Sequence, residues 1–395
     1  MSPGAPMSDA AVLYSAVGNV LTQYELDRGE ARLTRRAEFR MPSRVQYAWR
    51  HPAMPVLYVT TASSGPRTHS TDNQVTAFRI DQAGGLSQLG ETRSLAARAV
   101  HLCVDPQGKF VINAHNFPRS WVTVHRIRPD GSLGEAVGQH ERTDFGSYPH
   151  QVMTFPHVPA ALIVDRGNHA AQGKPEDPGA LRVYPMKDGR LVAGQVVAPD
   201  GGFGFGPRHV AFHPNEPWLY VADERHNRLA MFRVSNGLIE ERPAYVVATL
   251  ENAGAVGPRQ LVGAIHVHPD GRHVYVANRA DGTVEAGGRK VFAQGENSIA
   301  VFEIDPSSGE PVRIQNADTR SFHARTFALD PAGGLLVAAS IKAMDVLRDG
   351  TVEHVPAALS VFRIGPDGRL DYQRKYDVPL PEGEMQYWMG MVEPA

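Results

Sequence analysis

Residues 207–214 read Pro-Arg-His-Val-Ala-Phe-His-Pro, and residues 218–222 read Trp-Leu-Tyr-Val-Ala. Two short apolar runs on either side of a proline-containing turn are typical of antiparallel β-strands joined by a tight hairpin. A second copy stands at residues 265–277, where Ile-His-Val-His-Pro-Asp-Gly-Arg leads into His-Val-Tyr-Val-Ala. The hairpin therefore repeats, and the number and spacing of its copies decide the fold class.

An apolar run that ends in X-Pro, the first strand of this hairpin, occurs seven times in the 395 residues. The runs span residues 45–52, 99–106, 149–156, 207–214, 261–269, 325–331 and 385–394. Their terminal prolines stand 50 to 63 residues apart, and a third apolar run follows in most copies. Units of three or four short strands at this spacing predict an all-β fold, a seven-bladed β-propeller. Two stacked β-sandwiches would not explain seven evenly placed copies.

The two ends of the chain complement each other. The copy at residues 385–394 has no chain left for its outer strands, whereas residues 12–16 and 20–26 form strand-like runs without an inner strand. We expect the N-terminal strands to complete the blade that the C-terminal strand begins. Residues 1–395 then form a single propeller domain, with a flexible N-terminus at residues 1–10.

The composition excludes several classes of partner. Lys and Arg number 40 against 42 Asp and Glu, a net charge of −2 with no block of like charge, which argues against nucleic acid or acidic membranes as partners. The single cysteine, Cys103, excludes intramolecular disulfides and cysteine-based zinc sites. The apolar runs are far shorter than the roughly 20 residues of a membrane helix. With no basic leader at the N-terminus, we expect a cytoplasmic protein.

Residues 206–215 and 265–279 resemble the lactonase family of seven-bladed propellers, which includes a bacterial 6-phosphogluconolactonase and the fungal carboxymuconate lactonising enzyme. The resemblance extends over essentially the whole chain. The sequence departs from the family in three extra segments, residues 167–179, 280–297 and 341–358.

The repeat predicts which residues meet at one mouth of the central channel. The position six residues before each repeat proline opens the inner strand, and the position ten residues after it closes the second strand, so both sets lie at the same rim. The first set includes Trp388 in the seventh copy. The charged or ionisable members of the two sets are His150, Arg166, Arg208, Glu224, Arg279 and Arg325. The extra segments begin just beyond this rim and are expected to cover it as lids.

The resemblance implies that His150, Arg208, Glu224 and Arg279 are the catalytic residues. Arg166 and Arg325 supply further positive charge for an anionic substrate, and His266 is a possible channel residue that would also contact the substrate. The structural alternative is an ion pair between Arg208 and Glu224 across the mouth. If the two residues are functional, we expect truncation of either side chain to lower turnover strongly and to leave stability nearly unchanged. Unfolding of the variants would indicate the structural ion pair instead.

No metal or cofactor is expected. His266 and His268 alternate on one strand and would face the same side, as a chelating pair does. However, His213 and His268 occupy equivalent positions before the repeat proline, which indicates a shared packing or turn role. The glycine-rich residues 201–206 lack the Gly-Lys-Ser/Thr of a phosphate-binding loop.

Two classes of function remain open. The first is a metal-independent enzyme that hydrolyses, or reversibly forms, a lactone carrying a carboxylate or phosphate; a carboxymuconate-type cycloisomerase would use the same residues. Either Glu224 or His150 would move the protons. The second is a non-catalytic propeller that binds proteins. Among family substrates, the extra segments argue weakly against 6-phosphogluconolactone because they would narrow the mouth. The oligomeric state is not predicted.

Overall fold

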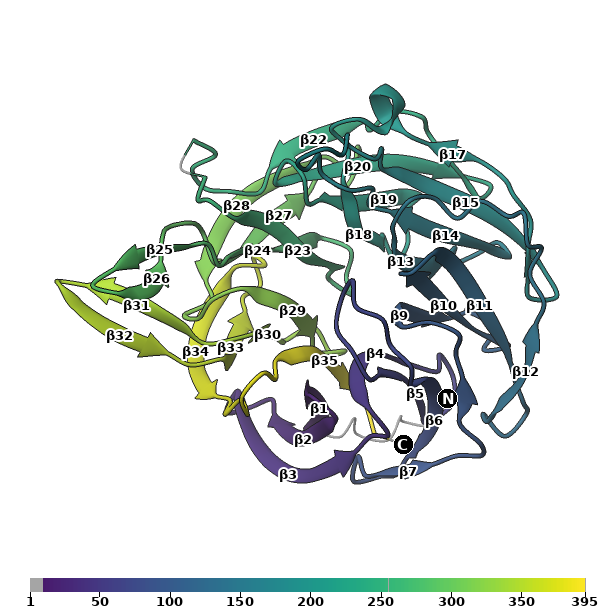
Figure 1. Cartoon of the computed structure of the whole chain (residues 1–395), viewed down its shortest axis with the longest axis horizontal. Coiled ribbons are helices and arrows are strands. Elements are labelled where there is room, and N and C mark those ends of the chain that lie inside the picture. The colour runs from purple at the N-terminus through teal and green to yellow at the C-terminus, as the bar shows by residue number, and fades with distance from the viewer. Residues whose placement is uncertain (1–9, 255, 395) are drawn as a thin grey trace.

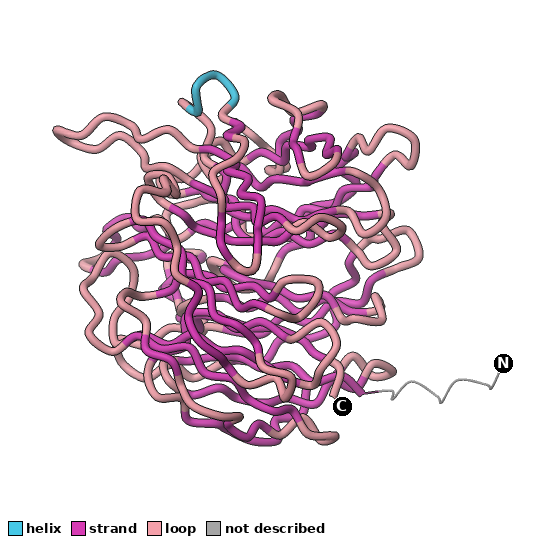
Figure 2. The backbone as a smooth tube through the Cα atoms, turned by 90° about the vertical axis from the view of Figure 1, so that its right-hand side faces the viewer, coloured by secondary structure: helices cyan, strands magenta, loops and turns pink. Residues whose placement is uncertain are grey.

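The computed structural model describes residues 10–254 and 256–394, so most of the N-terminus predicted to be flexible lies outside the described residues. Seven antiparallel sheets surround a central channel (Figure 1). Figure 2 shows that strands and loops make up the body, with one short 3₁₀ helix, Pro199–Gly202. Within the described residues, no helix is long and apolar enough to cross a membrane. The prediction of an all-β, seven-bladed propeller is confirmed.

We number the blades in chain order, each from its innermost strand outward. Blade 1 contains β4 (Arg44–Arg50), β5 (Val56–Ala62), β6 (Asn73–Ile80), β7 (Leu86–Gln88) and β8 (Arg93–Ser94). Blade 2 contains β9 (Ala99–Val104), β10 (Phe110–Asn116), β11 (Ser120–Ile127) and β12 (Leu133–Val137). Blade 3 contains β13 (Pro149–Thr154), β14 (Ala160–Asp165), β15 (Ala180–Lys187), β16 (Arg190–Leu191) and β17 (Val196–Val197).

The remaining blades follow the same plan. Blade 4 contains β18 (Pro207–Phe212), β19 (Trp218–Asp223), β20 (Arg228–Ser235), β21 (Leu238–Ile239) and β22 (Tyr245–Ala248). Blade 5 contains β23 (Gln260–Val267), β24 (His273–Ala280), β27 (Ser298–Ile304) and β28 (Pro311–Asp318). Blade 6 contains β29 (Ala324–Leu329), β30 (Leu335–Ser340), β33 (Ala358–Ile364) and β34 (Leu370–Asp377). Blade 7 contains β35 (Gln386–Val392), β1 (Ala10–Val17), β2 (Val20–Asp27) and β3 (Arg32–Arg40).

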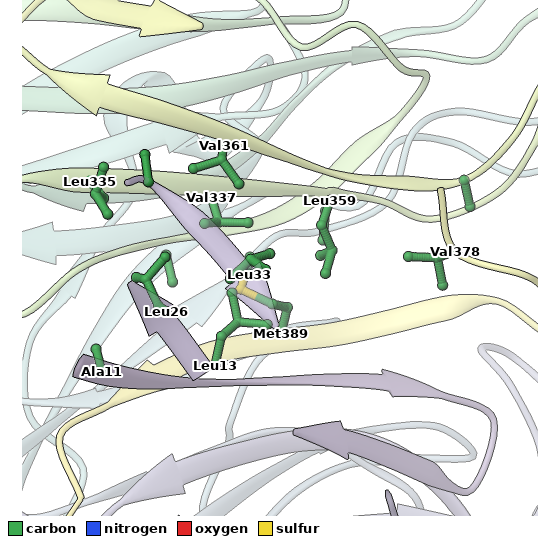
Figure 3. Close-up of a cluster of buried hydrophobic side chains, with 14 residues drawn as sticks. Ala11, Leu13, Leu26, Leu33, Leu335, Val337, Leu359, Val361, Val378 and Met389 are labelled. Atoms are coloured by element: carbon green, nitrogen blue, oxygen red, sulfur yellow. The ribbon is translucent and has the colours of Figure 1, made fainter. Parts of the chain in front are cut away.

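Blade 7 closes the ring as predicted. β35 pairs with β1 in antiparallel register, for example Tyr14 with Gly390. Figure 3 shows the apolar cluster between blades 6 and 7, where Leu13 and Met389 pack with side chains of β30 and β33 such as Val337. All three side chains are at most 2% exposed. Burial of each such side chain contributes about 1.5–3 kcal/mol, so the ring is closed by apolar packing as well as by strand pairing.

Repeated hydrogen bonds join neighbouring blades. Four tyrosines on second strands donate their hydroxyls to glycine carbonyls of the next blade at 2.6–2.9 Å. These tyrosines are Tyr14, Tyr58, Tyr220 and Tyr275. The rings of His213 and His268 contact the carbonyls of Gly271 and Gly333 at 2.8 and 2.9 Å. The shared packing role predicted for the two histidines is confirmed, and the ring of His268 is therefore not free to chelate a metal with His266.

Each of the seven innermost strands carries one extra residue near its start. In blade 3, Pro149 pairs with Asp165 and Gln151 with Val164, so His150 has no partner residue on β14. A β-bulge of this kind re-aims the side chain of the extra residue and is common beside functional sites. The seven extra residues are Gln46, Val100, His150, Arg208, one of Gly263 and Ala264, Arg325 and Tyr387.

The bulge in blade 7 corrects the predicted position of Trp388. Ala16 pairs with Trp388 and Val17 with Gln386, which leaves Tyr387 as the extra residue. Trp388 is 5% exposed and packs in a core cluster. The prediction missed by one residue because the seventh copy has one residue more between its bulge and its proline than the copies in blades 3, 4 and 6.

Two of the three extra segments do not cover the mouth. Residues 280–297 form the hairpin of β25 (Thr283–Ala286) and β26 (Arg289–Phe292), and residues 341–358 form that of β31 (Met344–Arg348) and β32 (Thr351–Val355). Figure 1 shows both hairpins extending outward from the ring, so the expectation of lids is wrong for them. A partial cover comes instead from residues 63–72, where Arg67 donates to Asn168 of the first extra segment at 3.3 Å.

Candidate active site

The channel contains two chambers that share a polar waist. A chamber of about 740 Å³ opens at the predicted mouth, and a second of about 460 Å³ lies on the side of the repeat prolines. Five of the bulge residues line both chambers: Val100, His150, Arg208, Arg325 and Tyr387. The β-bulges therefore place these five side chains where the two chambers meet, which we call the waist.

Six of the seven predicted site residues line the mouth chamber: His150, Arg166, Arg208, Glu224, Arg279 and Arg325. Arg166 and Glu224 directly follow β14 and β19, and their N–H groups donate to the carbonyls of Tyr148 and Gly206 just before the inner strands. The seventh residue, His266, is placed differently. It lines only the second chamber, where its ring lies 4.8 Å from that of Phe327. The structure therefore does not bring His266 together with the arginines.

Glu224 is the centre of a buried ion-pair network. Its carboxylate contacts the guanidinium groups of Arg208 (3.2 Å), Arg166 (2.9 Å) and Arg279. Glu224 is 3% exposed and Arg208 is 1% exposed. Burial raises the pKa of this carboxyl, but Arg279, Arg166 and Arg208 outweigh burial and lower it to about 2. Glu224 is thus a permanent carboxylate whose oxygens orient three arginines, and the ion pair weighed for Arg208 and Glu224 is present.

The network continues toward the extra segments. Arg279 lies 2.9 Å from Nε2 of His323, whose Nδ1 lies 3.3 Å from Asp281. Asp281 also pairs with Arg259 at 3.0 Å and with Lys342 at 2.7 Å. Burial lowers the pKa of His323 to about 3, so its imidazole is neutral. We call the group of Arg166, Arg208, Arg279, Glu224, His323 and Asp281 the paired side, because each of its cations contacts a carboxylate or is linked to one.

The opposite part of the mouth has cations without carboxylate partners. Arg98 is 2% exposed and donates to the amide oxygens of Gln46 at 3.0 Å and Asn116 at 3.3 Å. Arg325 stacks on the ring of Tyr387, with its guanidinium carbon 4.0 Å from the ring centre. Neither arginine forms an ion pair with any carboxylate in the described part of the chain. We call Arg98, Arg325 and Tyr387 the unpaired side.

Neutral imidazoles lie beside these charges. No described residue forms a hydrogen bond with either ring nitrogen of His150, and the ring lies 5.2 Å from that of His209. Burial and then the charge of Arg208 lower the pKa of both histidines well below the usual range. His150 therefore presents an uncharged, unengaged imidazole to the waist, the protonation state from which a general base accepts a proton.

The mouth chamber is strongly positive. Eight arginines and one lysine line it against two carboxylates, Glu224 and Asp281. An anionic ligand would remove part of the mutual repulsion of these cations, and arginine is suited to planar contacts with carboxylate or phosphate. Among the described residues, no group of three or more His, Cys, Asp or Glu side chains is arranged to hold a metal ion.

Several residues of the site were not predicted from the sequence. Arg98, Tyr148 and His323 stand two residues before Val100, His150 and Arg325, so the same repeat count extended by two positions finds them. Asp281 and Lys342 begin the two outward hairpins, and no repeat position marks them. Tyr387 was missed through the one-residue offset in blade 7.

Known proteins resemble this chain in sequence and in fold. Residues 11–347 match the family described as "Lactonase, 7-bladed beta-propeller". The chain is 33% identical to 6-phosphogluconolactonase of Bacillus subtilis, over 67% of this chain and 70% of the relative. It is 23% identical to 6-phosphogluconolactonase of Pectobacterium carotovorum, over 70% of this chain and 73% of the relative. The fold matches the periplasmic gluconolactonase PpgL of Pseudomonas aeruginosa with a TM-score of 0.68 at 21% identity, covering 95% of this chain and 98% of that structure. The chain therefore belongs to the lactonase family of seven-bladed β-propellers.

Proposed function

We propose that the protein hydrolyses an anionic sugar lactone, with 6-phosphogluconolactone as the substrate. The observation that carries this proposal is the excess of cations over carboxylates in the lining of the mouth chamber. Two relatives named 6-phosphogluconolactonase support the phosphorylated substrate. The chamber, about 740 Å³, is of the size that holds a small sugar acid.

The sequence argument against this substrate rested on a narrowed mouth. The β25–β26 and β31–β32 hairpins extend outward, and of the two extra segments that contain them only Asp281, Ile341 and Lys342 line the chamber. The premise therefore fails for two of the three extra segments, and we take the phosphorylated sugar lactone as the preferred substrate. The buried charges also disfavour a protein-binding scaffold, since Arg208 and Glu224 are at most 3% exposed and offer no surface to a partner.

In the proposed reaction His150 is the general base. Its imidazole takes a proton from water as the water oxygen attacks the lactone carbonyl, and the resulting oxyanion is stabilised by the guanidinium of Arg208. Glu224 is a poor base because its pKa is about 2 and its oxygens are held by three arginines, so it positions Arg166, Arg208 and Arg279. The phosphate offsets the cationic field that lowers the pKa of His150, which makes the imidazole more basic when substrate is bound.

The test compares 6-phosphoglucono-1,5-lactone with glucono-1,5-lactone, each measured above its spontaneous hydrolysis. One lost charged hydrogen bond is worth roughly 1.5–3 kcal/mol, so kcat/KM for the uncharged lactone should be about ten- to a hundredfold lower. Equal values for the two lactones would contradict the role of the cations. A muconolactone assayed in parallel tests the cycloisomerase alternative.

The remaining expectations are independent of the choice of lactone. We expect activity to be unaffected by EDTA, and loss of activity that one divalent ion restores would contradict metal independence. A cytoplasmic location and the absence of cofactor, nucleic-acid and membrane partners remain predictions from the sequence.

A further inference from the structure

We propose that Tyr387 is the catalytic acid that protonates the leaving ring oxygen of the lactone. This inference rests on the proposed hydrolase function and assigns a step that none of the residues predicted from the sequence performs. Arginines are too basic to donate a proton, Glu224 is ionised, and His150 must be unprotonated to activate water.

The backbone presents Tyr387 as it presents the other waist residues. Tyr387 is the extra residue of the β-bulge in β35, the position that His150, Arg208 and Arg325 occupy in β13, β18 and β29. Like them, it lines both chambers. A substrate held at the waist therefore meets the side chains of five bulges, and among these five the phenol of Tyr387 is the only neutral O–H donor.

The hydroxyl of Tyr387 has no structural acceptor. Four other tyrosines donate to glycine carbonyls of neighbouring blades, and burial raises the pKa of each: Tyr14, Tyr58, Tyr220 and Tyr275. Tyr387 forms no such bond with a described carbonyl. Instead its ring lies under Arg325, and Arg98 is within hydrogen-bonding reach of its hydroxyl.

The surrounding cations favour the phenolate. Burial alone raises the pKa of Tyr387, but Arg325 on β29, Arg98 before β9 and Arg208 on β18 outweigh burial and lower it below the ordinary value of 10.0. The two arginines of the unpaired side thus stabilise the charge that appears when the phenol gives up its proton.

In the proposed hydrolysis, protons move between water, His150, Tyr387 and the ring oxygen of the lactone. The water oxygen forms a bond to the carbonyl carbon while one water proton moves to His150. As the bond between that carbon and the ring oxygen breaks, the Tyr387 proton moves to the ring oxygen, which becomes the hydroxyl of the open acid. The imidazolium of His150 then returns its proton to the Tyr387 phenolate through solvent, and both groups regain their starting forms.

The kinetic test compares Tyr387→Phe with Tyr220→Phe. General acid catalysis contributes typically 10²–10⁴-fold, so Tyr387→Phe should lower kcat for 6-phosphoglucono-1,5-lactone by about 10²-fold or more with little change in KM. Tyr220→Phe removes an inter-blade hydrogen bond, and we expect it to lower the melting temperature while keeping kcat. Wild-type kcat in Tyr387→Phe overturns the inference while leaving the hydrolase proposal intact. Absence of lactonase activity in the wild type overturns both.

Two further readouts separate proton donation from a structural role. With an anionic aryl ester, whose phenolate leaves without protonation, the deficit of Tyr387→Phe should shrink toward the wild-type rate; an equal deficit on both substrates overturns the inference. In a spectrophotometric pH titration of the folded protein, Tyr387→Phe should lower the phenolate absorbance that develops below pH 10, because the surrounding arginines lower the pKa of Tyr387. A titration curve unchanged below that pH overturns it as well.

Discussion

The paired side and the unpaired side of the mouth contain the same type of cation in different surroundings. Arg166, Arg208 and Arg279 contact the carboxylate of Glu224. Among the described residues, the polar contacts of Arg98 and Arg325 are with amide oxygens, a backbone carbonyl and a tyrosine. Each side combines buried and half-buried residues, so the presence or absence of a carboxylate is what distinguishes them.

This difference indicates that the two sides of the mouth have different roles. A buried cation that already contacts a carboxylate is held in position and keeps the network together, whereas a buried cation without one is poised to receive the anion of the substrate. We therefore expect substitution of Glu224 on the paired side to act mainly on stability, whereas substitution of Arg208, whose guanidinium stabilises the oxyanion, should also lower turnover. Substitutions on the unpaired side should act mainly on substrate binding and turnover.

The largest effect is expected for Glu224→Gln. Loss of one partner of a buried ion pair costs about 3–5 kcal/mol, because the remaining charge stays buried without compensation. The unfolding free energy from urea titration should fall by that amount, contrary to the expectation from sequence that truncation leaves stability unchanged. The surface variant Glu384→Gln, which breaks the exposed pair with Arg44, is the control and should change it by less than about 1 kcal/mol. Equal denaturation midpoints for Glu224→Gln and Glu384→Gln would show that the carboxylate of the paired side contributes no more to stability than a surface carboxylate does.

Arg98→Met and Arg325→Met test the unpaired side. Each should lower kcat/KM for the phosphorylated lactone by about ten- to a hundredfold, since a charged hydrogen bond is worth roughly 1.5–3 kcal/mol. The unfolding free energy should fall less than in Glu224→Gln. Arg98→Met removes a buried cation but also leaves the buried amide oxygens of Gln46 and Asn116 without their donor, and Arg325 is only half-buried. The unphosphorylated lactone is the matched control, and its kcat/KM should change less. A similar loss on both lactones would show that these arginines do not recognise the anion.

A third prediction concerns His101, a buried histidine whose lowered pKa should make the stability of the protein depend on pH. Burial and then the charge of Arg208 lower the pKa of His101 to about 3, and its ring stacks on Tyr47 at 4.0 Å with both nitrogens unpaired. The folded pKa lies below the unfolded value near 6.5, so stability is fully present above pH 6.5 and is lost as pH falls toward 3.

His101→Phe should remove this pH dependence because phenylalanine does not titrate. Relative to wild type, the variant should gain about 2 kcal/mol of unfolding free energy on going from pH 8 to pH 5. Urea titrations at the two pH values measure the gain. A difference in unfolding free energy between variant and wild type that is the same at both pH values would mean that folding does not lower the pKa of His101.

The smallest effect is expected where the network reaches solvent. The Lys342 side chain is 36% exposed, and Asp281 keeps Arg259 and His323 when it is removed. Lys342→Met should therefore lower the unfolding free energy by less than about 1 kcal/mol and leave kcat nearly unchanged. A large loss of kcat in this variant would assign the base of the outward hairpin to the active site.

The sequence predicted most of the residues that line the mouth, but it misplaced two residues along the inner strands. Counting from the repeat prolines found Arg208 and Arg325 because the inner strands of blades 4 and 6 have the same length between bulge and proline. The same count selected Trp388 in place of Tyr387, since a shift of one residue along a strand turns the side chain to the other face. His266 was assigned to the channel, yet its depth along β23 places it in the other chamber.

What the sequence determined by itself is the local and repetitive part of the protein: strands, hairpins, seven blades and the closure of the ring by β1 and β35. These features depend on alternation and turn residues within a few positions. Only the tertiary structure decided which charges meet. Arg166 and Arg279 stand 58 and 55 residues from Glu224 in the chain, and three different blades bring them together. The distances between such side chains depend on the packing angle of neighbouring blades around the closed ring, which no local pattern specifies.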